Sequence, residues 1–242
     1  EIGVRLVGSE MCIRDRFCMS ENTWEIMKGM ELGDVELQMA LQCAPVITGV
    51  KVSNLLNIEL SGYRQMVEIL KDSDICMYTL GATCGRVNVF IYNAAKLRAF
   101  VQSDDVQRLM SELGYADMEL SEILAEFRGK YQQYLKSRGR FTSKQPAQED
   151  QACGDGALGK EWFPHEMGLL LGYPPEDVEG FILQNGRNAL CSGYWKVYED
   201  AESKRRTFHI FECAEERLIQ FLSNGLHMRD IMGMYTASRN AA

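Results

Sequence analysis

Three side chains in this sequence could together act as a thiol nucleophile. Cys43, His165 and Asp177 supply a thiol, an imidazole and a carboxylate in an order compatible with that role. In cysteine-dependent enzymes the imidazole takes the thiol proton and the carboxylate orients the imidazole. His165 follows Pro164 at an expected helix start, where the helix dipole would disfavour the protonated ring and keep it available as a base. A capping or hydrogen-bonding role explains His165 equally well, so both readings stay open.

A short aromatic segment offers a different chemistry, the binding of a planar ligand. Tyr194, Trp195, Lys196 and Tyr198 lie on a predicted strand and present aromatic faces and a cation. These groups could stack on a flat ligand such as a flavin or a porphyrin. The structural explanation is that the rings pack into a core while the lysine reaches solvent. The candidate ligand-binding residues are these four together with Lys51 and Cys191, and the sequence identifies no cofactor.

Thiol and imidazole groups also raise the question of a metal site. Cys43, His165 and Cys191 carry the ligand types that zinc and iron prefer, but their spacing does not show whether they meet. His209 and Cys213 are four residues apart on a predicted helix, opposite its apolar stripe, and are expected to face solvent. No metal is therefore predicted.

Composition excludes several classes of partner. The 242 residues are 46% hydrophobic and carry a formal net charge of −8, with a sequence pI of about 5.1. Such an acidic protein repels nucleic-acid phosphates and anionic lipid, so the expected partner is an unidentified protein or small molecule, with no nucleic acid and no membrane. The eight cysteines include no CxxC pair, and no apolar run approaches a membrane span. These features predict a cytoplasmic protein with free cysteines, in which Asp104-Asp105, Lys204-Arg205-Arg206 and Glu215-Glu216 are solvated surface charges.

Four segments are distinguished along the chain. Residues 1–18 include Met11 to Arg16, which resembles the translation of a sequencing adapter, so this segment is expected to be an artefact. Residues 19–136 are predicted to form an N-terminal α+β part, and the polar residues 137–160 a flexible linker. Residues 161–235 are predicted to form a helical part with one strand, packed on the first part as one domain.

Hydrophobic periodicity predicts an α+β fold, with a small antiparallel sheet flanked by helices. Alternation over 74–80 and 86–92, joined by the turn-forming Gly81 to Gly85, predicts a hairpin. The strand at 193–198 is expected to join this hairpin at 74–92 in the sheet. Helical spacing predicts helices at about 31–42, 95–113, 120–135, 165–171, 175–184 and 211–223. Ala44-Pro45 is expected to interrupt the first helix, and the second is expected to break near Ser103-Asp104.

The longest motif of the chain resembles a known family. It runs from His165 to Phe181 and continues through Asn185-Gly186 and Cys191 to Tyr198, while Cys43-Ala44-Pro45 with Gly49 and Lys51 forms a second element. Over about residues 35 to 232 the chain resembles the domain of unknown function 3793 family, found mainly in anaerobic Gram-positive bacteria. That resemblance implies no established activity, but family genes that lie near flavodoxin and iron-uptake genes suggest redox or iron physiology. The chain departs from the family at Gln42, where a histidine often precedes the cysteine, which puts in doubt any mechanism that needs that histidine.

Together these observations predict an accessory bacterial protein that binds a ligand or partner in a redox or iron context. The alternative is a cysteine-dependent enzyme using Cys43, His165 and Asp177.

Overall fold

A computed structural model describes residues 21–30, 35–137 and 164–240 of the chain. The segment 1–18 and nearly all of the linker predicted at 137–160 lie outside these described residues. The elements are α2 (Glu21–Lys28), α3 (Val35–Ile47), β1 (Ser53–Glu59), α4 (Leu60–Leu70), β2 (Ile75–Thr83), β3 (Arg86–Asn93), α5 (Ala94–Val101), α6 (Asp104–Glu112), α7 (Leu120–Ser137), α8 (Glu166–Leu170), α9 (Pro175–Leu183), β4 (Cys191–Ser192), β5 (Lys196–Val197), α10 (Ala201–Ser223) and α11 (Met228–Asn240).

The sheet confirms the α+β class and the predicted hairpin. Strands β2 and β3 pair antiparallel, and β1 adds to the far side of β3, which gives the order β1-β3-β2. The hairpin turns at Cys84 and Gly85, whose φ angles are 47° and 78°. Two successive residues with positive φ match the right-handed twist of paired strands, which is why this turn needs a glycine. One extra residue, Leu80, bulges from β2 between the pairs formed by Thr79 and Gly81.

The strand predicted at 193–198 does not join this sheet, and that expectation was wrong. Residues of the segment form β5, which pairs only with the two-residue β4 as a separate ribbon. The large side chains of this segment explain why it does not join the sheet, because residues of two helices hold them in place. The Trp195 indole donates to Asp177 of α9, and the Tyr194 hydroxyl donates to Glu215 of α10.

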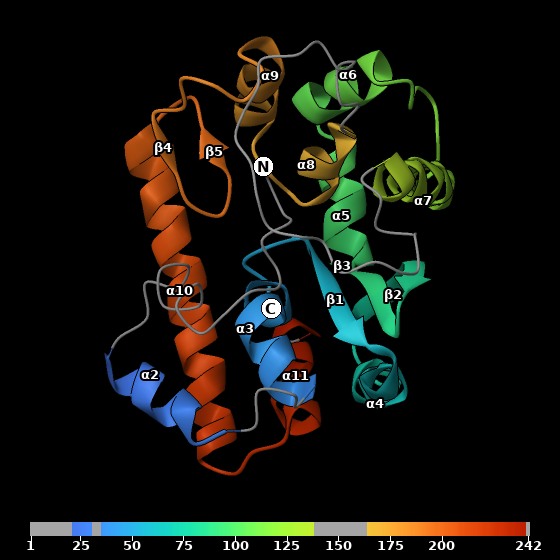
Figure 1. Ribbon diagram of the computed structural model, residues 1–242. Helices are drawn as coiled ribbons and strands as arrows, with labels where there is room; N and C mark the ends of the chain where they lie inside the picture. The colour runs from blue at the N-terminus through green and yellow to red at the C-terminus, as the bar shows by residue number, and fades with distance from the viewer. Residues whose placement is uncertain (1–20, 31–34, 138–163, 241–242) are drawn as a thin grey trace, which may run out of the picture.

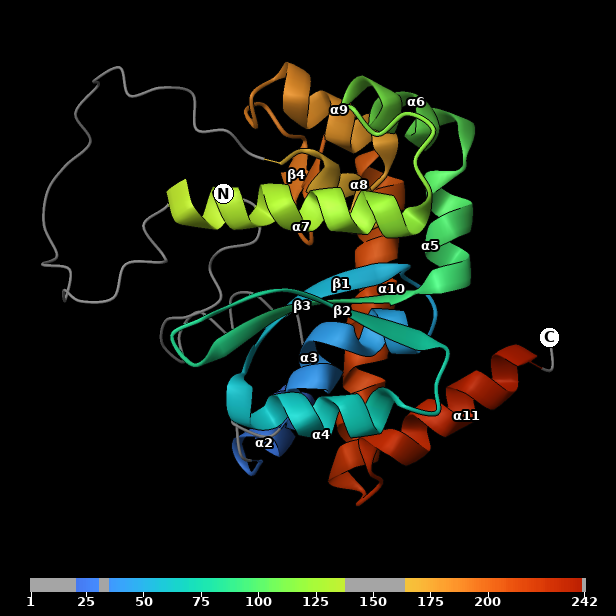
Figure 2. The same ribbon diagram turned by 90° about the vertical axis from the view of Figure 1, so that its right-hand side faces the viewer.

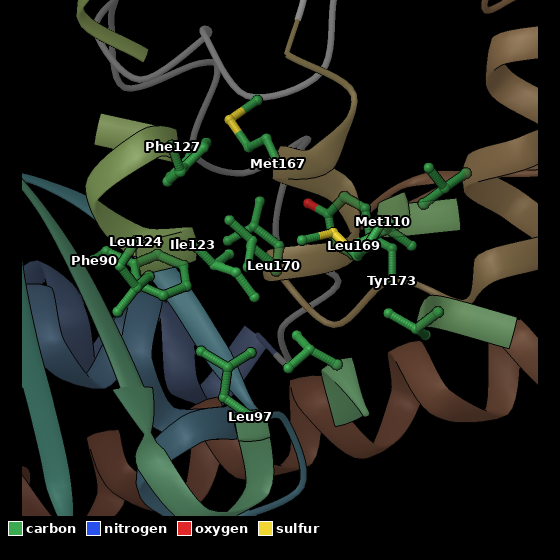
Figure 3. Packing of buried hydrophobic residues seen from close by; sticks show 14 of the residues in the cluster. Phe90, Leu97, Met110, Ile123, Leu124, Phe127, Met167, Leu169, Leu170 and Tyr173 are labelled. Atoms are coloured by element: carbon green, nitrogen blue, oxygen red, sulfur yellow. The ribbon is translucent and has the colours of Figure 1, made fainter. Parts of the chain in front are cut away.

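The sheet separates two layers of helices, as Figure 2 shows. Helices α3, α4 and α11 lie on one side, and α7 and α8 on the other. Successive side chains of β3 point to opposite sides of the sheet. Val89 and Ile91 pack in the core with α3, whereas Phe90 packs toward α7. Figure 3 shows the core on the α7 and α8 side of the sheet, where Phe127 of α7 and Leu170 of α8 gather near Phe90.

Helix α3 continues through Pro45, although the sequence suggested an interruption there. Proline removes one donor from the helix, but it lies in the last turn, so only one helical hydrogen bond is lost. The Pro45 carbonyl then accepts from the backbone nitrogens of both Val50 and Lys51, each at 2.9 Å. Gly49, at φ 82°, allows the chain to reverse. This closure places Lys51 immediately beside the end of α3.

The remaining helix predictions are confirmed in outline. The break near Ser103-Asp104 separates α5 from α6, and α7 covers the helix predicted at 120–135. Helix α10 is longer than predicted, and it runs past both layers and packs along α3 (Figure 1). In the described parts of the chain no helix is long and apolar enough to cross a membrane.

Candidate functional site

A small cavity of about 30 Å³ lies between α8, α9 and β5, which are grouped at the top of Figure 1. Its floor is formed by buried side chains, namely Met167, Leu171, Tyr173, Val178 and Trp195. Its rim is formed by half-buried residues, namely His165, Gly168, Phe181 and Lys196. The space is enough for about two water molecules and is lined mostly by apolar atoms. Four residues singled out from the sequence, His165, Asp177, Trp195 and Lys196, therefore meet at one cavity.

Asp177 fixes the position of the aromatic segment. One carboxylate oxygen accepts from Trp195 Nε1 at 2.7 Å, and the other accepts from the backbone nitrogens of Tyr198 at 2.7 Å and Glu199 at 3.2 Å. The carboxylate is buried, and three donors satisfy it. Asp177 thus holds the floor tryptophan in place against α9.

The other candidate residues of this segment differ in their surroundings. Lys196 donates to the Gly186 carbonyl at 2.7 Å, and its Nζ lies 5.9 Å from the centre of the Phe181 ring. Burial lowers the pKa of His165 below its ordinary value, although Glu166 opposes the shift, so the rim imidazole is neutral at pH 7. Cys191 is half-buried in β4 and packs on the core, and Tyr198, also half-buried, follows β5 and lies against Gly180 of α9.

A second group of ionisable side chains lies deeper in the protein. We call Cys43, Lys51, Tyr194 and Glu215 the Lys51 cluster. Lys51 Nζ donates to the Asn54 side chain at 3.0 Å, and the Tyr194 hydroxyl donates to Glu215 Oε1 at 2.7 Å. Glu215 Oε2 is buried without a hydrogen-bond partner. Glu215 is 2% exposed and Lys51 7%, so both groups are largely withdrawn from water.

Burial dominates the electrostatics of this cluster. It lowers the pKa of Lys51 to about 8 and raises the pKa of Glu215 to about 8. The attraction between the two groups opposes both shifts without cancelling them. Burial also raises the pKa of the Cys43 thiol far above its ordinary value, against the smaller effect of Lys51. At neutral pH Cys43 is therefore a thiol, and Glu215 is largely protonated.

Two aromatic rings connect the Lys51 cluster to the cavity. Lys51 Nζ lies 5.6 Å from the centre of the Tyr173 ring. Tyr173 in turn stacks on Trp195, with ring centres 5.1 Å apart and planes 28° apart. Because both rings form the cavity floor, the buried ammonium of Lys51 lies directly behind that floor.

Glu215 and Tyr173 were missed by the sequence analysis, and the assignment of Glu215 to solvated surface was wrong. A signal for Glu215 was present, since Phe211, Glu215 and Leu218 follow one another at helical spacing on the buried side of α10. Glu215 therefore interrupts an apolar stripe, and a carboxylate in that position needs a buried partner.

The three residues of the proposed thiol triad lie in two regions. Cys43 is buried in the core shared by the sheet and α3. His165 and Asp177 line the cavity in the layer of α8 and α9, across the sheet from α3 (Figure 2). No three His, Cys, Asp or Glu side chains of the described ranges are placed to share a metal ion.

Comparison with known proteins gives one match. A family model described as a protein of unknown function (DUF3793) matches residues 39–232. Neither the curated proteins nor the solved structures contain a match. The match includes both the Lys51 cluster and every residue that lines the cavity.

Proposed function

The chain belongs to the DUF3793 family of proteins of unknown function, and we propose that it is an accessory protein that binds a small planar anion in the cavity between α8, α9 and β5. The observation that carries this proposal is the convergence of His165, Trp195 and Lys196 on one cavity. An apolar pocket with a few converging polar groups is the common form of a small-molecule site.

The floor of the cavity favours a flat apolar body. Trp195 and Tyr173 line it with rings that are stacked on each other, and Met167, Leu171 and Val178 close the remaining sides. A cavity that holds benzene has about 150 Å³. A planar ligand must therefore widen the space, which would require a rim side chain such as the half-buried Phe181 to move.

The cations around the cavity favour an anion, because the lining carboxylate of Asp177 is already satisfied by three donors. Lys196 stands on the rim, and Lys51 stands behind the Tyr173 ring. The imidazole of His165 is neutral at pH 7 and can donate a hydrogen bond or stack without repelling a cofactor ring. A flavin phosphate or a porphyrin carboxylate would meet the Lys196 ammonium, which would give the protein a redox or iron context.

The experiment uses Trp195 as its reporter. The sequence holds three tryptophans, so Trp24→Phe and Trp162→Phe leave Trp195 alone. Flavin mononucleotide, iron protoporphyrin and benzoate are titrated separately, and saturable quenching is expected with at least one of them. Quenching by the flavin or the porphyrin supports the redox or iron context, whereas quenching by benzoate alone supports a small aromatic acid.

A matched pair of variants tests the role of the rim cation. Lys196→Met should weaken binding by about tenfold, because the anion loses a charge-assisted hydrogen bond. Lys71→Met removes an exposed lysine elsewhere and should leave the affinity unchanged. The absence of saturable quenching with all three ligands would overturn the proposal.

The cysteine-dependent enzyme stays a prediction without a specific observation in its favour. A buried thiol with a raised pKa is a poor nucleophile, and the Asp177 carboxylate is occupied by Trp195 and two backbone donors.

A further inference from the structure

Cys213 lies on the solvent-facing side of α10, so its thiol is exposed, whereas the Cys43 thiol is buried. Cys213 Sγ lies 3.6 Å from His209 Nε2, and His209 Nδ1 lies 3.5 Å from Glu212 Oε2. Cys213 is exposed, and the His209 side chain is 74% exposed. Thiol, imidazole and carboxylate thus lie within two helical turns, with the thiol at hydrogen-bonding distance from the imidazole and the carboxylate at ion-pair distance from it.

This order gives each group a defined part. With its hydrogen on Nδ1, the nitrogen nearest the Glu212 carboxylate, the His209 ring leaves Nε2 to accept the Cys213 proton. An imidazole that takes the thiol proton makes the sulfur nucleophilic. Glu212 acts through the ring that it orients, and is therefore a positioning residue. These three residues form what we call the Cys213 site.

The neighbouring charges indicate which substrates approach the site. Residues 205, 209, 213 and 217 succeed one another at four-residue intervals, so Arg205 and Arg217 flank the site on the same helix face. Both arginines are exposed. Arg217, one helical turn beyond Cys213, and Arg205, two turns before it, attract anions toward the exposed sulfur, although Glu212 and the whole protein are acidic.

We propose that the Cys213 site is a modification site that exchanges its thiol with small anionic disulfides. The Cys213 proton passes to His209 Nε2, and the sulfur attacks one sulfur of the disulfide. The disulfide bond of the substrate breaks, a bond forms between Cys213 and the attacked sulfur, and the other half leaves as a thiolate that can take the proton from His209. Cys213 is oxidised and the leaving half is reduced, so the exchange needs no further oxidant. This inference is independent of the ligand proposed for the cavity.

Cys84 provides an internal control for the test. It is also exposed, but it lies in the hairpin turn, on a different element from His209 and Glu212. The full chain is treated with dithiobis-nitrobenzoate, an anionic disulfide, and the modified residues are quantified by peptide mass spectrometry over time. Cys213 is expected to react about tenfold faster than Cys84, less than the roughly hundredfold or more that an enclosed base provides, because the site is open to water.

Substitutions separate the parts of the Cys213 site. His209→Ala keeps a good helix former and should bring the Cys213 rate down to that of Cys84, and added imidazole should restore it. Glu212→Gln should lower the rate about two- to threefold, while Glu212→Asp should retain part of the advantage. Arg205→Glu with Arg217→Glu should slow the anionic reagent and speed cystamine, a cationic disulfide.

Two results would overturn the proposal. One is an equal rate at Cys213 and Cys84 in the unchanged protein. The other is a Cys213 rate that does not respond to His209→Ala, or that imidazole does not restore after this substitution. Far-ultraviolet circular dichroism of each variant shows whether the helix persists, so a folding defect is distinguished from loss of the base.

Discussion

The two faces of α10 place similar groups in opposite surroundings. Glu215 points inward, where it meets Tyr194 and the field of Lys51. Cys213, two residues earlier, points into solvent beside His209. Cys43 of α3 shows the contrast best, since it is the same residue type as Cys213 but is buried in the core with a raised pKa.

That difference shows that residue type alone does not assign chemistry in this protein. Burial makes the inner thiol inert and keeps the inner carboxyl protonated, whereas water and an imidazole make the outer thiol available. The buried groups can therefore affect the stability of the fold through their protonation, whereas the exposed thiol on the outer face of α10 can react with other molecules.

The largest effect is expected from Glu215→Lys. This change sets a second cation beside Lys51 in the core and removes the acceptor of the Tyr194 hydroxyl. Uncompensated buried charge costs about 3–5 kcal/mol, so the free energy of unfolding in urea should fall by that amount. Gln220→Lys, on the exposed side of the same helix, should change it by less than about 0.5 kcal/mol. Equal effects of the two variants would contradict the buried position of Glu215.

A smaller effect should separate the two cysteines. Cys43→Ser buries a hydroxyl among apolar side chains and should cost about 1–3 kcal/mol of unfolding free energy. Cys213→Ser replaces one exposed polar group by another and should be close to neutral. Chemical denaturation of both variants measures this difference. A destabilised Cys213→Ser with an unaffected Cys43→Ser would reverse the comparison.

The pH dependence of stability reports directly on Glu215. An unfolded glutamate loses its proton near pH 4.5, whereas Glu215 in the fold loses it near pH 8. Between these values the folded state binds the extra proton, so stability that is present below pH 4.5 is lost as the pH rises through about 8. The free energy of unfolding should fall by at most about 1.4 kcal/mol per pH unit.

The interval from pH 6.5 to 8 isolates this effect. Below 6.5 the lowered pKa of His165 acts in the opposite direction, and above about 8 so does the lowered pKa of Lys51. Urea denaturation across the interval should show the downward slope in the unchanged protein and in Glu202→Gln, but a nearly flat line in Glu215→Gln. A slope that survives Glu215→Gln would mean that another group carries it.

Local patterns predicted part of the local structure of this chain, but not helices α2, α4 and α11. The alternation around Gly81 to Gly85 identified the hairpin, and the break at Ser103 separated α5 from α6, because both depend on residues close in sequence. His209 and Cys213 were expected to face solvent, and they do, because helical spacing decides it.

Features that depend on distant contacts could not be obtained in the same way. The segment at 193–198 looked like a strand of the sheet, but Asp177 and Glu215 draw its aromatic side chains to two helices. Pro45 looked like a break, but its carbonyl gains two donors from the following turn. The Lys51 cluster joins α3, β5 and α10, so no single stretch of sequence contains its pattern.

The attachment of α3 to the last helices has a consequence for synthesis of the protein on the ribosome. The backbone nitrogen of Met228 donates to the Glu36 carboxylate at 2.9 Å, and Arg239 donates to the Ile47 carbonyl at 2.7 Å. Each contact joins residues 192 positions apart. Contacts of such separation form slowly and only after the later segment has left the ribosome. A growing chain therefore holds Lys51 in water with an ordinary ammonium group until α10, which carries Glu215, has left the ribosome and can pack on α3.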